Sequence, residues 1–146
     1  DVAGATNRLT LIAAILPAGC ASTHTVFCLR TPLGPVAQHV LCGLFNSLVV
    51  NYLVRLRVTT HVTTSIVERL PLPRFEDGPA ACREIAALTR RLGRRPSAED
   101  FARLNGLVAR LYRLSAKEFV HVLETFPLVD RVDRDLALVA HAALDR

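Results

Sequence analysis

A run without charged side chains, from Thr31 to Val54, constrains the fold more than any other feature of the sequence. From residue 36 to about residue 56 apolar side chains recur every three or four positions, the spacing of one face of an α-helix. Pro35 stands where a first helical position would be. This pattern predicts one long apolar helix, whose face comprises Leu41, Leu44, Phe45, Leu48, Val49 and Tyr52.

Two interpretations of this helix differ in what surrounds it. Arg30 and Arg55 flank the run as they would flank a membrane span. Polar side chains interrupt the run, however, among them Gln38, Asn46 and Asn51. Because such residues are costly in lipid, we expect a buried core helix and no membrane partner.

The proline-rich stretch from Leu70 to Pro73 divides the chain into two regions, 1–75 and 76–146, because proline cannot continue a helix. Beyond it the pattern is purely helical. Four helices are expected there, since four start signals of the capping type precede apolar runs. These signals begin at Asp77, Ser97, Ser115 and Asp130.

Before the prolines the pattern is mixed. Residues 9–16 and 25–29 are short apolar runs of strand length, each closed by proline and glycine, and residues 55–59 alternate polar and apolar side chains. We therefore predict an α+β fold. It has short strands and one long apolar helix in the first half, followed by a helical C-terminal tail of about four helices.

Charge is distributed unevenly along the chain. The net charge is +5, Lys117 is the single lysine among 18 basic residues, and no acidic residue occurs from Val2 to Val67. An excess of arginine attracts polyanions at long range and suits bidentate phosphate contacts. A mostly buried apolar half with few charges of either sign would give the same count, so both interpretations stay open.

No catalytic centre is indicated by the sequence. Phosphate-binding glycine loops, a GxSxG elbow and HExxH are all missing. The neighbouring carboxylates of the second half stand at predicted helix starts, where we expect them to cap amides; they are Glu99, Asp100, Asp130, Asp133 and Asp135. The four cysteines form no CxxC, and only Cys20, His24 and Cys28 lie close in sequence. We therefore expect no catalytic residue and no metal site, and reduced thiols in a cytoplasmic protein.

A polar segment after the long helix carries the best candidate binding residues. Arginine binds phosphate or guanine through two hydrogen bonds, and hydroxyl and imidazole groups reach backbone oxygens or base edges. The same composition also suits a polar edge strand. The segment contains Arg55, Arg57, Thr59, Thr60, His61, Thr63 and Thr64.

Several segments resemble, in order, the C-terminal part of large adenine-N6 DNA methyltransferases of restriction–modification systems. Residues 7–19 are similar to the family's "N-x-R-T-hydrophobic-A-x-I-hydrophobic-P" opening, and residues 44–56 to its "LLNS" helix. Residues 60–73 resemble the segment that ends in "LPLP". Residues 111–119 and 125–127 are similar to its "LYGLS" and "FP" helices. The match covers roughly residues 7–129, and Arg113 stands where the family usually has glycine.

The resemblance implies that residues 1–75 are part of a target-recognition domain and that residues 76–146 are a helical tail packing on it. An upstream methyltransferase domain of the same parent chain would use S-adenosylmethionine, and the parent would carry the enzyme activity, with or without an endonuclease. The fragment itself would hold no cofactor. The absence of Met agrees with a piece of a longer protein.

We therefore expect a non-catalytic fragment that binds and positions duplex DNA for site recognition. A protein–protein interaction or dimerisation module without DNA affinity, including a homodimer of the fragment, is the open alternative. The residues predicted to contact DNA are Arg8, His24, Arg55, Arg57, Thr60, His61 and Thr63.

Overall fold

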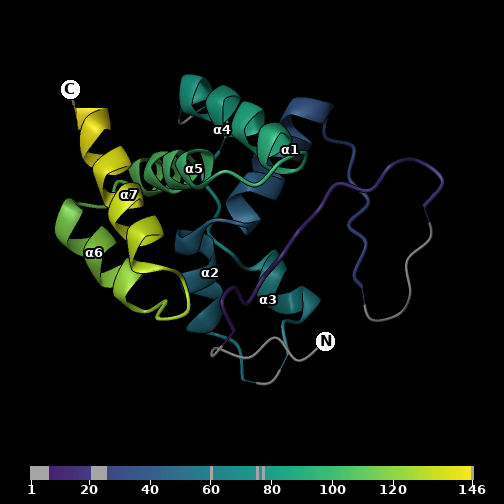
Figure 1. The fold of residues 1–146 in the computed structure, drawn as a ribbon. Coiled ribbons are helices and arrows are strands. Elements are labelled where there is room, and N and C mark those ends of the chain that lie inside the picture. Colours follow the sequence, from purple (N-terminus) through teal and green to yellow (C-terminus); the bar gives the residue numbers. More distant parts are fainter. Residues whose placement is uncertain (1–6, 21–25, 60, 75, 77, 146) are drawn as a thin grey trace.

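Helices form the regular structure of this protein in a computed structural model that describes residues 7–20, 26–59, 61–74, 76 and 78–145 (Figure 1). No strand occurs within these ranges, so the predicted α+β class is wrong and the described chain is all-helical. The elements are α1 (Pro35–Phe45), α2 (Leu48–Arg55), α3 (Thr64–Glu68), α4 (Pro79–Leu92), α5 (Ala98–Leu111), α6 (Ala116–Glu124), α7 (Arg131–Ala142) and the short 3₁₀ helix η2 (Ala143–Asp145).

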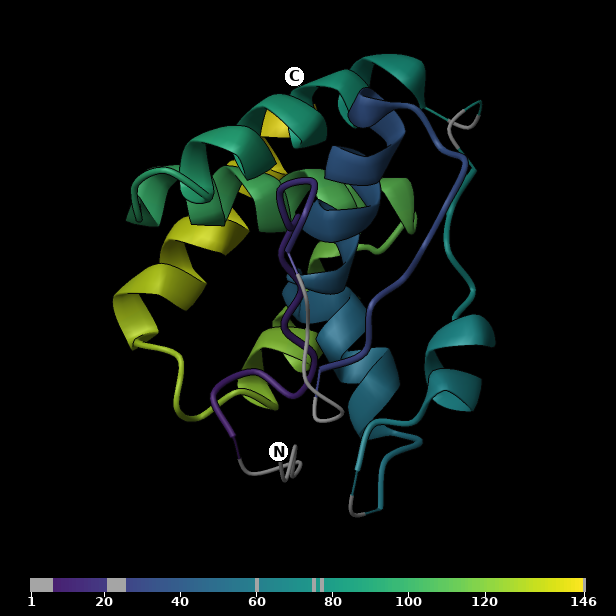
Figure 2. The ribbon, with the colours of Figure 1, turned by 90° about the vertical axis from the view of Figure 1, so that its right-hand side faces the viewer.

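The three predicted strands fail for different reasons. Residues 9–16 run alongside α1 and α2 without a partner strand (Figure 2), and side chains of these helices take their backbone hydrogen bonds. The described part of 25–29, residues 26–29, also lacks regular structure. Residues 55–59 fall at the end of α2, where the N–H groups of Arg57 and Val58 both donate to the carbonyl of Val54, at 2.9 Å. Alternation and β-branching favour a strand only where another strand pairs with it.

The long apolar helix is two helices, α1 and α2, bent by 59° at Asn46 and Ser47. Ser47 begins α2, because its hydroxyl accepts a hydrogen bond from the N–H of Val50 at 3.3 Å. The Oδ1 atom of Asn105 accepts another from the N–H of Leu48 at 2.7 Å. The two side chains thus satisfy amides that a continuous helix would bond internally, which makes the break stable.

The predicted helical tail is present as α4 to α7. Ser97 caps α5 by accepting from the N–H of Asp100 at 3.2 Å. Ser115 and Glu118 form a complete capping box at the start of α6. Asp130 precedes α7 without a side-chain capping bond. The capping signals in the sequence therefore locate these helix starts to within one residue.

Two close helix crossings hold the fold together. In Figure 1, α4 lies on α1 and α7 lies across α5. A Cβ atom on Gly43 of α1 would collide with Thr89 and Ile85 of α4. A Cβ atom on Gly106 of α5 would lie 2.8 Å from the backbone nitrogen of His141 in α7. Only glycine permits both approaches.

One core spans both predicted regions of the chain. The tail packs against α1 and α2, whose apolar faces are buried inside the protein. The largest fully buried apolar side chains of this core come from both sides of residue 75. They include Leu48, Val50, Val54, Ile85, Leu88, Leu104, Phe119 and Phe126.

No single helix in the described ranges is long and apolar enough to span a membrane. Only α1 and α2 taken together reach that length and composition, across their 59° bend.

Candidate nucleic-acid interface

Arg55, the last residue of α2, is held by contacts inside the protein. Its Nη1 atom donates to the carbonyl oxygen of Thr125 at 2.6 Å, and its Nε atom donates to Oγ1 of Thr10 at 3.1 Å. Its Nη2 atom bonds the carbonyl of Asn7, and the guanidinium carbon lies 3.9 Å from the ring centre of Phe126. Partial burial lowers the pKa of Arg55. The side chain therefore joins three segments, and its hydrogen-bonding capacity is largely used.

Asn51 of α2 binds the backbone of the N-terminal segment. Its Oδ1 atom accepts hydrogen bonds from the N–H groups of Thr10 and Leu11, at 2.8 and 2.7 Å. Its Nδ2 atom donates to the carbonyls of Phe45 and Ser47, both at 2.9 Å. Asn51 is fully buried and all four bonds are made, so it fastens the segment to the helix break.

Asn46 repeats this arrangement one helical turn earlier. Its side chain accepts from the N–H of Ala13 at 3.1 Å and donates to the carbonyl of Ala13 at 2.8 Å. Asn46, Asn51 and Arg55 thus form hydrogen bonds with the N-terminal segment that a neighbouring strand would otherwise form. Sequence analysis assigned Asn46 and Asn51 no such role, although amides on the buried face of an uncharged helix signal obligatory hydrogen bonds.

Three of the predicted DNA-contact residues lie together in the connection between α2 and α3. Arg57, His61 and Thr63 are all exposed there. Arg57 donates from Nη1 to the carbonyl of Leu53 at 2.8 Å, which leaves other guanidinium donors on the surface. The Thr63 hydroxyl accepts from the N–H of Ile66 at 3.3 Å and caps α3.

The other predicted contacts differ in position. The backbone carbonyl of Arg8 lies 3.4 Å from Nη2 of Arg55, so Arg8 sits near the end of α2. Its own guanidinium pairs with Asp133 of α7 at 3.4 Å and remains exposed. His24 and Thr60 lie outside the described residues. Arg57, His61 and Thr63 are therefore exposed residues of one connection, and Arg8 lies close to Arg55.

Charge at this end of the molecule follows from the acid-free stretch of sequence. The described residues from Asn7 to Val67 contribute no carboxylate, and Glu68 at the end of α3 is the first acidic residue after them. No acidic side chain forms an ion pair with Arg57 among the described residues. The connection between α2 and α3 therefore presents positive charge and hydroxyl groups.

No metal site is formed by the described residues. No group of three or more His, Cys, Asp or Glu side chains gathers among them. Cys20 and Cys28 are exposed, and Cys82 is buried. Burial raises the pKa of the Cys42 thiol, an effect partly opposed by its hydrogen bond with Asn46.

Comparison with known proteins adds no relative. No family model, no curated protein and no solved structure matches this chain. The similarity to DNA methyltransferases therefore rests on the sequence segments quoted above, and the function has to be argued from the residues themselves.

Proposed function

We propose that this chain is the non-catalytic C-terminal part of a restriction–modification DNA methyltransferase, and that it binds and positions duplex DNA. The observation that carries the proposal is the exposed connection between α2 and α3. It presents Arg57, His61 and Thr63 at the end of an acid-free stretch.

The chemistry of these side chains suits a DNA backbone. A guanidinium group forms charge-assisted hydrogen bonds with phosphate oxygens, and hydroxyl and imidazole groups add shorter-range donors. Such phosphate contacts position a protein on the duplex, whereas base-edge contacts select the sequence.

Arg55 has a different part in this proposal. Its guanidinium lies among Thr10, Thr125 and Phe126, so it positions the end of α2 from which the connection departs. A direct phosphate contact by Arg55 would require breaking these bonds. We therefore assign DNA contact first to Arg57, His61 and Thr63, and then to Arg8.

The upstream domain of the parent chain would supply S-adenosylmethionine and the transfer of its methyl group, in the cytoplasm where the DNA substrate is found. This chain would contribute affinity and orientation alone. Among its described residues, no group of three or more His, Cys, Asp or Glu side chains gathers that could hold a metal ion.

A salt titration tests the proposal. Duplex DNA affinity of the wild-type chain is expected to fall linearly on a log–log plot as salt rises, because phosphate contacts release counterions. Arg57→Ala is expected to weaken binding to all sequences alike and to reduce the slope by about 1. Fluorescence anisotropy with a labelled duplex measures both quantities.

Arg95→Ala is the matched control, since Arg95 is an exposed arginine in the turn between α4 and α5. It should leave affinity and slope near the wild-type values. Affinity that does not change with salt, or equal effects of the two substitutions, would contradict the proposed interface.

A protein–protein interaction module is the second candidate, and one observation favours it. The N-terminal segment exposes large apolar side chains, with Ile12, Phe27 and Leu29 at 74%, 72% and 65% exposure. Apolar groups on a chain without a partner strand suit contact with another polypeptide. The apolar faces of α1 and α2 do not form this surface, because they are buried in the core.

Light scattering of the purified chain distinguishes this candidate. A stable dimer that is lost in Phe27→Ser, together with no measurable affinity for duplex DNA, would favour the interaction module. A monomer with salt-dependent DNA affinity would exclude it.

A further inference from the structure

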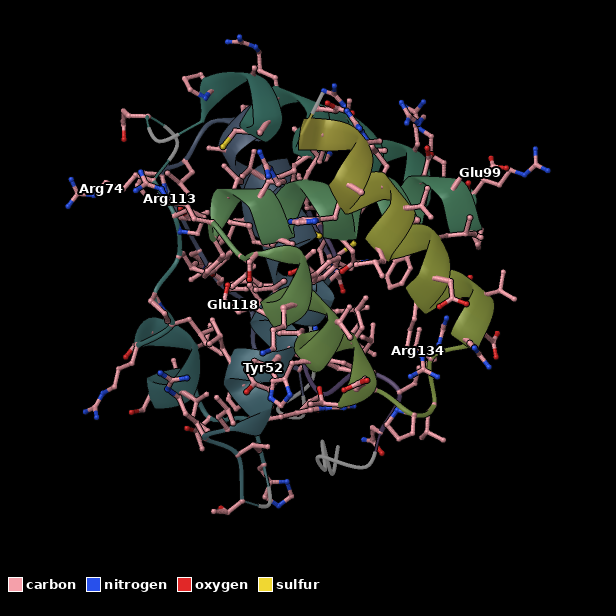
Figure 3. All side chains as sticks on the ribbon, turned by 90° about the vertical axis from the view of Figure 1, so that its left-hand side faces the viewer. Tyr52, Arg74, Glu99, Arg113, Glu118 and Arg134 are labelled. Carbon is pink, nitrogen blue, oxygen red and sulfur yellow. The ribbon has the colours of Figure 1, made fainter. Side chains whose placement is uncertain are left out.

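An open pocket of about 430 Å³ lies where the proline-rich segment meets the end of α5. Figure 3 places Arg74 and Arg113 at this edge of the molecule, away from Tyr52 of α2. The pocket is therefore separate from the proposed DNA interface. It is lined by Pro71, Leu72, Pro73, Ala81, Arg110, Leu111, Tyr112 and Arg113.

Arg113 reaches the pocket from an unusual backbone position. Its φ angle is +56°, in the left-handed region that glycine adopts most easily. Its N–H donates to the carbonyl of Arg110 at 2.8 Å, and the N–H of Leu114 donates to that of Ala109 at 3.0 Å. These are the two bonds of a Schellman motif, whose left-handed residue is usually glycine. A side chain larger than glycine's costs stability in this conformation, and such strained positions cluster at functional sites.

The guanidinium of Arg113 is available for a ligand. No described residue pairs with it, and Arg113 is exposed. A second hollow of about 320 Å³ adjoins the first and shares Arg110 and Arg113 with it. The nearby carboxylate of Glu118 accepts from the N–H and the hydroxyl of Ser115, at 2.8 and 2.7 Å. Arg113 thus places one exposed guanidinium at the rim of both hollows.

The pocket walls are apolar and partly flat. The lining includes Pro71, Pro73, Leu72, Leu111 and Tyr112, together with Ala81 of α4. A ligand that satisfies both features carries an anionic group for the arginines and a flat, weakly polar part for the walls. Phosphate fits the guanidinium fork, and a nucleobase stacks on apolar surfaces. The volume of this open pocket, about 430 Å³, suits one such unit better than a peptide.

We propose that this pocket binds a nucleotide, with its phosphate on Arg113 and its base against Pro71, Pro73 and Tyr112. The nucleotide is either free or one unit of a single strand, since both present the same phosphate and base. This site lies beyond the duplex interface proposed above and uses none of its residues.

Calorimetric titration with dAMP, inorganic phosphate and a single-stranded thymidine decamer tests the proposal. Wild-type chain should bind dAMP saturably, and Arg113→Gly should weaken that binding at least tenfold. Arg113→Gly should also raise the melting temperature, because glycine relieves the left-handed strain. Weaker binding by a more stable protein cannot be attributed to misfolding. Arg95→Ala should leave dAMP affinity unchanged.

Ala81→Leu tests the base-binding wall independently. The larger side chain would fill part of the pocket, so dAMP affinity should fall while the effect on inorganic phosphate is smaller. Decamer affinity above that of dAMP, with the same loss in Arg113→Gly, would identify a strand as the ligand. Affinity for dAMP alone would identify a free nucleotide.

Three outcomes would overturn the proposal. These are dAMP binding that Arg113→Gly leaves unchanged, inorganic phosphate binding as tightly as dAMP, and an acidic peptide displacing dAMP at equal concentration. The duplex proposal is tested separately by Arg57→Ala, which should leave dAMP affinity unchanged, so either proposal can fail alone.

Discussion

At the scale of single residues, three side chains decide how the N-terminal segment is held. Asn46 accepts from and donates to its backbone, and Asn51 accepts hydrogen bonds from two of its N–H groups. Arg55 donates to its carbonyls and to the hydroxyl of Thr10. The sequence analysis singled out Arg55 as a DNA-contact residue of a polar arginine- and threonine-rich segment. It did not identify its partners, because Thr10 and Thr125 are distant in sequence and meet Arg55 only in the folded chain.

Replacing Arg55 should destabilise the fold. Arg55→Ala removes charge-assisted hydrogen bonds and the contact with Phe126, so we expect a loss of about 2–3 kcal/mol in the free energy of unfolding. Arg55→Lys keeps the charge but loses the planar fork, and should fall between the alanine variant and wild type. Urea denaturation followed by circular dichroism measures these differences.

Arg57→Ala is the control for this series, because Arg57 is exposed and, among the described residues, its guanidinium bonds the carbonyl of Leu53 in the preceding helix. Its unfolding free energy should change by about 0.5 kcal/mol or less. Equal stabilities of Arg55→Ala and wild type would show that Arg55 is not a structural residue and would return it to the DNA-contact set.

At the scale of elements, helix starts were predictable and strands were not. Ser97 and Ser115 cap helices within a few residues, so local sequence suffices to locate α5 and α6. Residues 9–16 have the composition of a strand, but a strand needs a partner, and helix side chains supply its bonds instead. The break between α1 and α2 depends on Asn105, 57 positions away from Leu48, and no local pattern reveals it.

The capping box of α6 should make stability depend on pH. Hydrogen bonds from the side chain and backbone of Ser115 hold the pKa of Glu118 below its ordinary value of 4.5. The unfolded chain therefore binds this proton more readily, so the stabilisation is present above pH 4.5 and is lost as pH falls through the folded-state pKa. The stability difference between wild type and Glu118→Gln should be largest near neutral pH.

Denaturant unfolding at several pH values, from neutral to ~3, checks this expectation. At the acidic end, wild type and Glu118→Gln both carry an uncharged side chain at position 118, so the difference between them should shrink. Glu99→Gln is the control for removing a surface carboxylate from the first turn of a helix, since Glu99 projects into solvent from α5 (Figure 3). A difference between wild type and Glu118→Gln that stays constant with pH would mean that the charge of Glu118 does not stabilise α6.

At the scale of the whole molecule, the core connects the two regions that the prolines separate in sequence. The residues between them, 70–73, lack helical structure, as the sequence indicates. Yet α1 packs on α4, and α2 contacts α5 and α6. A composition boundary shows where a helix stops. It does not show whether the helices before and after the boundary pack against one another, as they do in this protein.

Shared packing should make unfolding a single cooperative event. Gly106→Ala offers a test, because the new Cβ would lie 2.8 Å from a backbone atom of α7 and force α5 and α7 apart. Overpacking of this kind costs about 1–3 kcal/mol. If the core is one unit, amides of α1 and α2 should lose the same hydrogen-exchange protection as amides of α5 and α7, although the substitution is in the tail.

Gly93→Ala is the matched control. Gly93 has a φ angle of −68°, and a Cβ atom there would lie 3.4 Å from its nearest neighbour, the carbonyl oxygen of Thr89. Its protection pattern should match that of wild type. If Gly106→Ala reduced protection in α5 and α7 while α1 and α2 remained protected, the two regions would unfold separately. The proline-rich segment would then mark a true domain boundary, and DNA binding through the α2–α3 connection would survive that partial unfolding.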